Sequence, residues 1–192
     1  MLPTWVGRKT VREGVVFIVA TLALALVSRA SLRKPGSHGF YRFFAWECML
    51  GLFVLNMQVW NAAPNSANQI ISGLLFFVSL LLVLSGVGLL QLSGQPDPER
   101  NDVTLLGFEK TTTLVTTGVY HHVRHPIYGS LLFLCWGFFF KQPSLAGGVL
   151  AVSACGLIVA ATRAEETENI GYFGEQYREY MRSTKMFVPF IL

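Results

Sequence analysis

The chain has 192 residues, of which 52% are hydrophobic and only 14% are charged. Soluble domains carry about 25% charged residues, so this composition excludes an ordinary soluble domain and indicates a single domain surrounded by lipid. The formal net charge of +4 is modest and the basic residues are scattered, which argues against a nucleic-acid-binding surface.

Five apolar stretches predict an all-α, polytopic integral membrane protein with about five transmembrane helices. No charged residue lies between Glu47 and Asp97, an interval long enough for two crossings of about 20 residues each. The fourth stretch has only about 14 apolar residues, so a buried or re-entrant helix is an alternative there. The stretches cover residues 14 to 31, 43 to 61, 68 to 92, 127 to 140 and 144 to 162.

The first stretch has a second interpretation, because basic residues precede it and Ser28-Arg29-Ala30 resembles a signal-peptide cleavage site. Arg33 and Lys34 follow this site, which favours a retained helix. In the second stretch, Glu47 is a functional candidate as a charge inside the membrane, but we favour an interpretation in which it snorkels or pairs with Arg42.

The segment from Gln95 to Val123 contains prolines, charges and the run Thr111-Thr112-Thr113, so it must lie in water or in a protein-lined cleft. If this segment and the C-terminal tail share one face of the membrane, that face has eleven basic residues against four opposite, which predicts a cytosolic position. With five crossings, the basic N-terminal leader then lies outside, which violates the rule that basic residues are enriched on the cytosolic side. The eleven are Arg29, Arg33, Lys34, Arg42, Arg100, Lys110, Arg124, Arg163, Arg178, Arg182 and Lys185; the four are Arg8, Lys9, Arg12 and Lys141.

Lys141-Gln142-Pro143 separates the last two stretches, so a tight hairpin is expected. This hairpin brings together Val119 to Tyr128, which opens the fourth stretch, and Arg163-Ala164-Glu165-Glu166, which closes the fifth. The tail after Glu166 has the pattern of an amphipathic helix with Phe173, Tyr177, Tyr180 and Met181 on one face.

These two polar groups favour a zwitterionic ligand that carries an additional positive charge. Pro126 suits the first turn of a helix, so Arg124 and His125 are expected just outside the helix start, beside free N–H donors that attract an anion. Glu165 and Glu166 favour a cation such as an ammonium or a sulfonium, and tyrosines add cation–π attraction of about 0.5 to 2 kcal/mol. Methyl transfer from a sulfonium requires positioning and a dry pocket more than acid–base groups.

Four ordered blocks carry a specific resemblance. Thr113 to Tyr120, Arg124 to Tyr128, Glu165-Glu166 and Phe173 to Tyr180, followed by Pro189-Phe190, resemble isoprenylcysteine carboxyl methyltransferases and the related phospholipid methyltransferases. The resemblance covers roughly residues 112 to 190. The first three predicted helices resemble the family only in their apolar character, without a matching motif.

The resemblance implies S-adenosylmethionine as cofactor, in a cytosolic pocket between the last two helices and the C-terminal helix. It implies cofactor contacts from Thr112, Thr113, Leu114, Val115, Tyr120, His125, Pro126, Ile127, Tyr128, Glu165 and Glu166. Arg124, Arg163 and Glu165 are the expected catalytic residues, with an arginine holding an anionic head group.

Three positions depart from the family pattern. Thr112 and Leu105 stand where the family often has a His and a Gln, and Ala161 stands near the family's substrate-side arginine, with Arg163 displaced from it. Each expected contact also has a structural alternative: Arg124 as a basic flank of a membrane helix, and the two glutamates as partners of Arg163 beyond the helix end.

We therefore predict one membrane domain, residues 1–192, with three helices in 1–92 and a catalytic region in 93–192. The predicted activity is S-adenosylmethionine-dependent methylation of a lipophilic membrane acceptor, most like an isoprenylcysteine carboxylate. The alternatives are a phospholipid amine N-methyltransferase, an NADPH-dependent enzyme similar to sterol reductases, and a non-catalytic membrane binding protein. No metal site is expected, because the three cysteines, Cys48, Cys135 and Cys155, lie in apolar runs without ligand spacing.

Overall fold

The computed structural model describes residues 4–97 and 104–188, with side chains from residue 11 onwards. The predictions that involve Arg8, Lys9, Arg100 and Pro189-Phe190 lie outside these side chains. Within the described ranges every regular element is helical, which confirms the all-α prediction. The helices are α1 Thr4–Val27, α2 Arg29–Leu32, α3 His38–Leu55, α4 Ala67–Ser93, α5 Pro126–Lys141, α6 Leu145–Phe173 and α7 Glu175–Ser183, with the 3-10 turns η1 Met57–Val59, η2 Gly107–Glu109 and η3 Gly118–His121.

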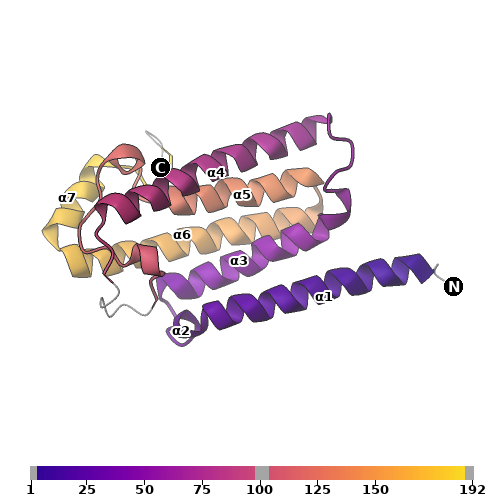
Figure 1. Cartoon of the computed structure of the whole chain (residues 1–192), viewed down its shortest axis with the longest axis horizontal. Helices are drawn as coiled ribbons and strands as arrows, with labels where there is room; N and C mark the ends of the chain where they lie inside the picture. The colour runs from indigo at the N-terminus through magenta and orange to yellow at the C-terminus, as the bar shows by residue number, and fades with distance from the viewer. Residues whose placement is uncertain (1–3, 98–103, 189–192) are drawn as a thin grey trace.

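The helices α3, α4, α5 and α6 lie side by side as a bundle, in which α4 packs mainly on α5 and α3 mainly on α6 (Figure 1). The long helix α1 runs along α3 on the outside of the bundle. The turns η2 and η3 and the short helix α7 gather at one end, where they cover the start of α5 and the end of α6.

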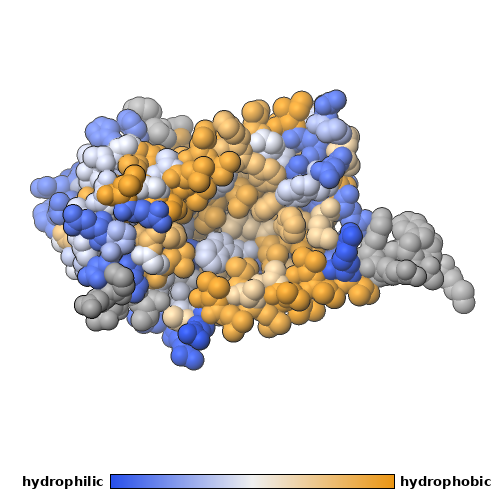
Figure 2. Space-filling view, in the orientation of Figure 1, coloured by the Kyte–Doolittle hydropathy of each residue, from blue (hydrophilic) through white to orange (hydrophobic). Residues whose placement is uncertain are grey.

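Exposed apolar side chains lie along the middle of the bundle, on α1, α4 and α6. Leu74, Phe77, Leu81 and Leu84 of α4 are between 52% and 62% exposed. Figure 2 shows apolar side chains over the middle of the visible face, with hydrophilic residues gathered at both ends. The helices α4 and α6 are each long and apolar enough to cross a membrane, whereas α5, with 16 residues, is shorter. The exposed apolar side chains thus indicate a lipid environment, and five crossings stay a prediction.

The seam between α4 and α5 is made of small residues. Ser72, Ser79 and Gly86 are the buried residues of α4, seven positions apart. The Ser72 and Ser79 hydroxyls each donate a 2.8 Å hydrogen bond to a backbone carbonyl of α5, at Gly137 and Ser130. Small side chains let the two backbones approach, and the hydrogen bonds fix their register inside an apolar environment.

Two predicted helix ends are wrong. The fifth stretch does not end at residue 162, because Thr162 bonds back to the carbonyl of Ile158 and the helix continues to Phe173, where Gly174 with φ +64° ends it. Glu165 and Glu166 therefore lie on α6 and not beyond it. The second stretch ends at Leu55 rather than 61, because Asn56 caps α3 and donates its side-chain amide to the carbonyl of Phe138.

Candidate functional site

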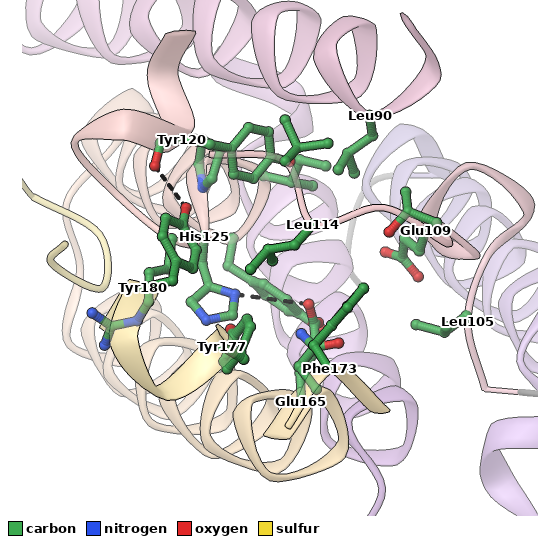
Figure 3. A pocket seen from close by; sticks show the side chains of 17 residues that line it. Leu90, Leu105, Glu109, Leu114, Tyr120, His125, Glu165, Phe173, Tyr177 and Tyr180 are labelled. Carbon is green, nitrogen blue, oxygen red and sulfur yellow. Dashed lines mark hydrogen bonds and ion pairs between the residues drawn. The ribbon is translucent and has the colours of Figure 1, made fainter. Parts of the chain in front are cut away.

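A pocket lies at the end of the bundle that α7 and the loops cover (Figure 3). Its walls come from the end of α4, the segment between α4 and α5, the start of α5, the end of α6, and α7. The lining residues are Leu90, Leu105, Glu109, Thr111, Leu114, Val115, Tyr120, Arg124, His125, Pro126, Ile127, Tyr128, Glu165, Asn169, Phe173, Tyr177 and Tyr180.

The start of α5 forms as the sequence predicts, with Pro126 at the first helical position and His125 before it. The free donors of the first turn stay a prediction, whereas the two amides just before this turn are paired. The backbone N–H groups of Arg124 and His125 donate to the carbonyls of Lys185 and Met186, at 2.8 and 3.1 Å. These bonds hold the C-terminal segment against α5, so the polar side chains, and not these amides, face the pocket.

The structure brings the two distant polar groups together at this point. His125 Nδ1 lies 3.8 Å from Glu165 Oε1, and His125 Nε2 lies 3.3 Å from Glu166 Oε1. Arg124 Nε donates to the same Glu166 oxygen at 2.8 Å, and its NH1 group donates to the carbonyls of Met181 and Thr184. Glu166 therefore has both Arg124 and His125 as partners, whereas Glu165 has a long contact to the imidazole and lies near the Tyr128 side chain.

Glu165 and Tyr128 each present an unsatisfied polar atom to the pocket. Glu165 Oε2 and the Tyr128 hydroxyl are buried, and neither forms a hydrogen bond with any residue in the described ranges. An unpaired buried polar group costs about 1 to 3 kcal/mol, and more if it is charged. A ligand that donates to the carboxylate and pairs with the hydroxyl would remove this cost.

Three buried tyrosines close the pocket on the side of α7. The Tyr180 hydroxyl donates to the carbonyl of Tyr120 at 2.6 Å, and the Tyr120 hydroxyl donates to the carbonyl of Gly86 at 3.4 Å. Burial raises the pKa of Tyr120, Tyr177 and Tyr180 far above the ordinary value, so all three stay neutral phenols. They serve as packing and hydrogen-bonding groups, and none of them is a base at neutral pH.

The opposite wall depends on two ion pairs that sequence reasoning missed. Arg42 of α3 donates to Glu109 at 2.7 Å, and the side chains are 6% and 11% exposed. His38, fully buried at the start of α3, contacts Glu168 of α6 at 2.5 Å. Burial opposes protonation of His38, but the hydrogen bond to Glu168 and the charge of Glu165 outweigh it and raise the pKa of His38.

The enclosed space of the pocket is narrow, about 70 Å³. Small-molecule pockets usually measure about 300 to 1,000 Å³. A ligand of nucleoside size therefore enters only if part of the wall moves. The wall segment that carries Leu105 and Glu109 contains no long helix. It is tied to α3 by the Arg42–Glu109 pair and by hydrogen bonds of Arg42 and His38 to the Thr104 carbonyl.

The family model of phospholipid methyltransferases matches residues 67–176, more than half of the chain. The chain belongs to the phospholipid methyltransferase family. Within this family, a methanethiol S-methyltransferase of Crocosphaera subtropica is 28% identical over 171 residues, which are 82% of this chain and 63% of the relative. A protein-S-isoprenylcysteine O-methyltransferase of Mus musculus is 35% identical over 89 residues, which are 42% of this chain and 29% of the relative.

A methanethiol S-methyltransferase of Mycobacterium tuberculosis is 34% identical over 73 residues, which are 37% of this chain and 28% of the relative. The chain thus spans less than two thirds of the length of each of these relatives. No solved structure matches the chain significantly.

The segment that matches the phospholipid methyltransferase family contains every predicted site residue. Of these, Leu114, Val115, Tyr120, Arg124, His125, Pro126, Ile127, Tyr128 and Glu165 line the pocket. Glu166 lies behind His125 and Arg124. Thr112 and Thr113 bond to the backbone and side chain of Gln95 instead of lining the pocket, where Thr111 takes their place.

The structure places two further predicted charges elsewhere. Arg163 forms no ion pair with Glu165 or Glu166 and lines a neighbouring groove. Glu47 does not pair with Arg42, because Arg42 is held by Glu109; Glu47 instead accepts a 2.7 Å hydrogen bond from Thr21 of α1.

Proposed function

We propose that this protein is an S-adenosylmethionine-dependent methyltransferase that acts on a lipophilic membrane acceptor, with its pocket at the cytosolic face. One observation carries the proposal: the pocket holds a buried carboxylate oxygen, Glu165 Oε2, that has no partner among the described residues. Family membership supports the reaction class, and the methyl donor would supply an electrophilic methyl group on a sulfonium.

The pocket residues fit such a donor in charge and in polarity. Glu165 can accept hydrogen bonds from an ammonium or from a ribose hydroxyl, and the Tyr128 hydroxyl is available to a polar group. Leu90, Leu114 and Ile127 supply an apolar wall that excludes water from a reacting centre. His125, held between the two glutamates, keeps the carboxylates in place.

The acceptor class is proposed from the groups that could act as a base. Tyr120, Tyr177 and Tyr180 stay protonated, and the candidates for a base toward an amine, Glu165 and His125, contact each other. An acceptor that is already an anionic nucleophile needs no base and therefore suits this site better. We propose a lipid carboxylate such as isoprenylcysteine as the acceptor. A thiol is the second candidate, because a methanethiol S-methyltransferase is similar over 82% of this chain.

The test measures donor binding and methyl transfer separately. Calorimetric titration of S-adenosylmethionine into the detergent-solubilised protein gives the donor affinity of wild type and of Glu165→Gln. Because a hydrogen bond to a charged group contributes about 1.5 to 3 kcal/mol, we expect the variant to bind about ten- to a hundredfold more weakly. Glu13→Gln, which changes a carboxylate near the start of α1, is the matched control and should bind as wild type does.

Labelled methyl transfer is then measured with a prenylcysteine analogue, a small thiol, phosphatidylethanolamine and a membrane extract. Transfer to the prenylcysteine supports the proposal, transfer to the thiol supports the second candidate, and transfer only to the amine lipid contradicts both. Binding of NADPH without binding of S-adenosylmethionine would refute the methyltransferase. Donor binding without transfer to any acceptor would indicate a binding protein.

A further inference from the structure

A second cavity of about 570 Å³ lies beside the pocket, between α5, α6 and the segment that follows α7. Its volume is within the range of small-molecule sites. Leu132 and Trp136 of α5, Val159 of α6 and Phe187 form its apolar part. We call this cavity the α5–α6 groove.

The charges that line the groove are all positive. Arg124, Arg163 and Lys185 line it, and no carboxylate does so within the described ranges. The side chains of Arg163 and Lys185 are exposed, and neither forms an ion pair with a residue that the structure describes. Two cations without counter-ions at the mouth of an apolar groove are complementary to an anion with a hydrocarbon tail.

We propose that the α5–α6 groove binds a membrane lipid with an anionic head group. The head group lies at Arg163 and Lys185, and an acyl chain follows Leu132 and Trp136. Moving the chain from the bilayer into the groove gains little, because the lipid interior is equally apolar. The preference for an anionic lipid must therefore come from its head group. Each basic residue near the membrane surface raises the affinity about fivefold.

The groove is distinct from the methyl-donor pocket, with which it shares only Arg124. Arg124 is engaged by Glu166 and by two backbone carbonyls, so it is a structural part of the wall between the two cavities. The proposal depends on Arg163 and Lys185, which line only the groove. It therefore holds or fails independently of the methyltransferase activity.

Quenching of Trp136 by brominated lipids tests the proposal, because this ring lines the groove. The protein is placed in phosphatidylcholine vesicles that contain increasing fractions of either brominated phosphatidylglycerol or brominated phosphatidylcholine. Subtracting the signal of Trp136→Phe isolates this tryptophan. We expect the anionic lipid to quench Trp136 at a lower fraction than the zwitterionic lipid does.

The double variant Arg163→Gln/Lys185→Gln should lose this preference, by about fivefold for each cation removed. Arg178→Gln is the matched control, since it removes an exposed cation of α7 outside the groove and should leave the preference unchanged. Circular dichroism and gel filtration confirm that each variant is folded. Equal quenching by the two lipids in wild type, a preference that survives the double variant, or an equal loss in Arg178→Gln would each overturn the proposal.

Discussion

Replacing Arg42 with methionine removes the cationic partner that holds Glu109 and keeps most of the side-chain volume. Arg42 NH1 lies 2.7 and 2.9 Å from the two Glu109 oxygens, and NH2 donates to the carbonyl of Thr104 at 3.2 Å. Both side chains are nearly buried, at 6% and 11% exposure. Breaking a buried pair by removing one partner costs about 3 to 5 kcal/mol, so Arg42→Met should lower the free energy of unfolding by this amount.

Combining Arg42→Met with Glu109→Gln should restore about half or more of the loss, because the carboxylate no longer needs a counter-ion. Burial raises the pKa of Glu109 above its ordinary value although Arg42 lowers it, so loss of Arg42 raises the pKa further. A carboxyl whose pKa is higher in the folded state gains stability as the pH falls through that pKa. Arg42→Met should therefore recover stability in mild acid.

Unfolding by sodium dodecyl sulfate in mixed micelles, followed by circular dichroism, measures these free energies at several pH values. The reasoning is refuted if Arg42→Met lowers the free energy of unfolding by less than about 1 kcal/mol, or if the double variant is less stable than the single variant. Either result would mean that Glu109 is not a buried charge that requires Arg42. A loss that does not depend on pH would indicate that the contact to Thr104, and not Glu109, is responsible.

Two further predictions concern the contacts of α3 and α4. The pKa of His38 in the folded state is raised from its ordinary value of 6.5. Protonated His38 therefore stabilises the fold fully below pH 6.5, and this stabilisation is lost as the pH rises through the folded pKa. His38→Gln should remove this step from the pH profile of the free energy of unfolding. In α4, a Cβ at Gly86 would lie 2.9 Å from Ile127, whereas a Cβ at Gly88 meets open space. Gly86→Val should cost about 1 to 3 kcal/mol by thermal unfolding in detergent and Gly88→Val much less, and equal losses would contradict the close packing of α4 on α5.

The sequence predicted the part of the site that depends on local patterns. Pro126 marks the start of α5 because its missing N–H suits a first turn, and the hairpin follows from Lys141-Gln142-Pro143. Together these patterns predicted that His125 and Glu165 would approach one another, and they lie 3.8 Å apart. The end of α6 was missed because Arg163 to Glu166 suggest a membrane boundary, yet polar residues do not end a helix.

The opposite wall was not predictable, since it consists of partners far apart in the chain. Arg42 and Glu109 are separated by 67 positions, and His38 and Glu168 by 130. No periodicity or spacing relates such residues, and the short separation of Arg42 and Glu47 in the sequence favoured the wrong local pair. Glu109 is followed directly by Lys110, so nothing in the sequence indicated that its partner would be a distant cation.

The ties between α3 and the pocket affect how this family can be recombined. The segment shared with the phospholipid methyltransferases, residues 67–176, contains the acids Glu109 and Glu168, whereas their bases Arg42 and His38 precede it. A chimaera that joins this segment to foreign leading helices would import two acids without their cations. Such a chimaera is expected to fold only if the protein that supplies the leading helices also has basic residues at the positions that face Glu109 and Glu168.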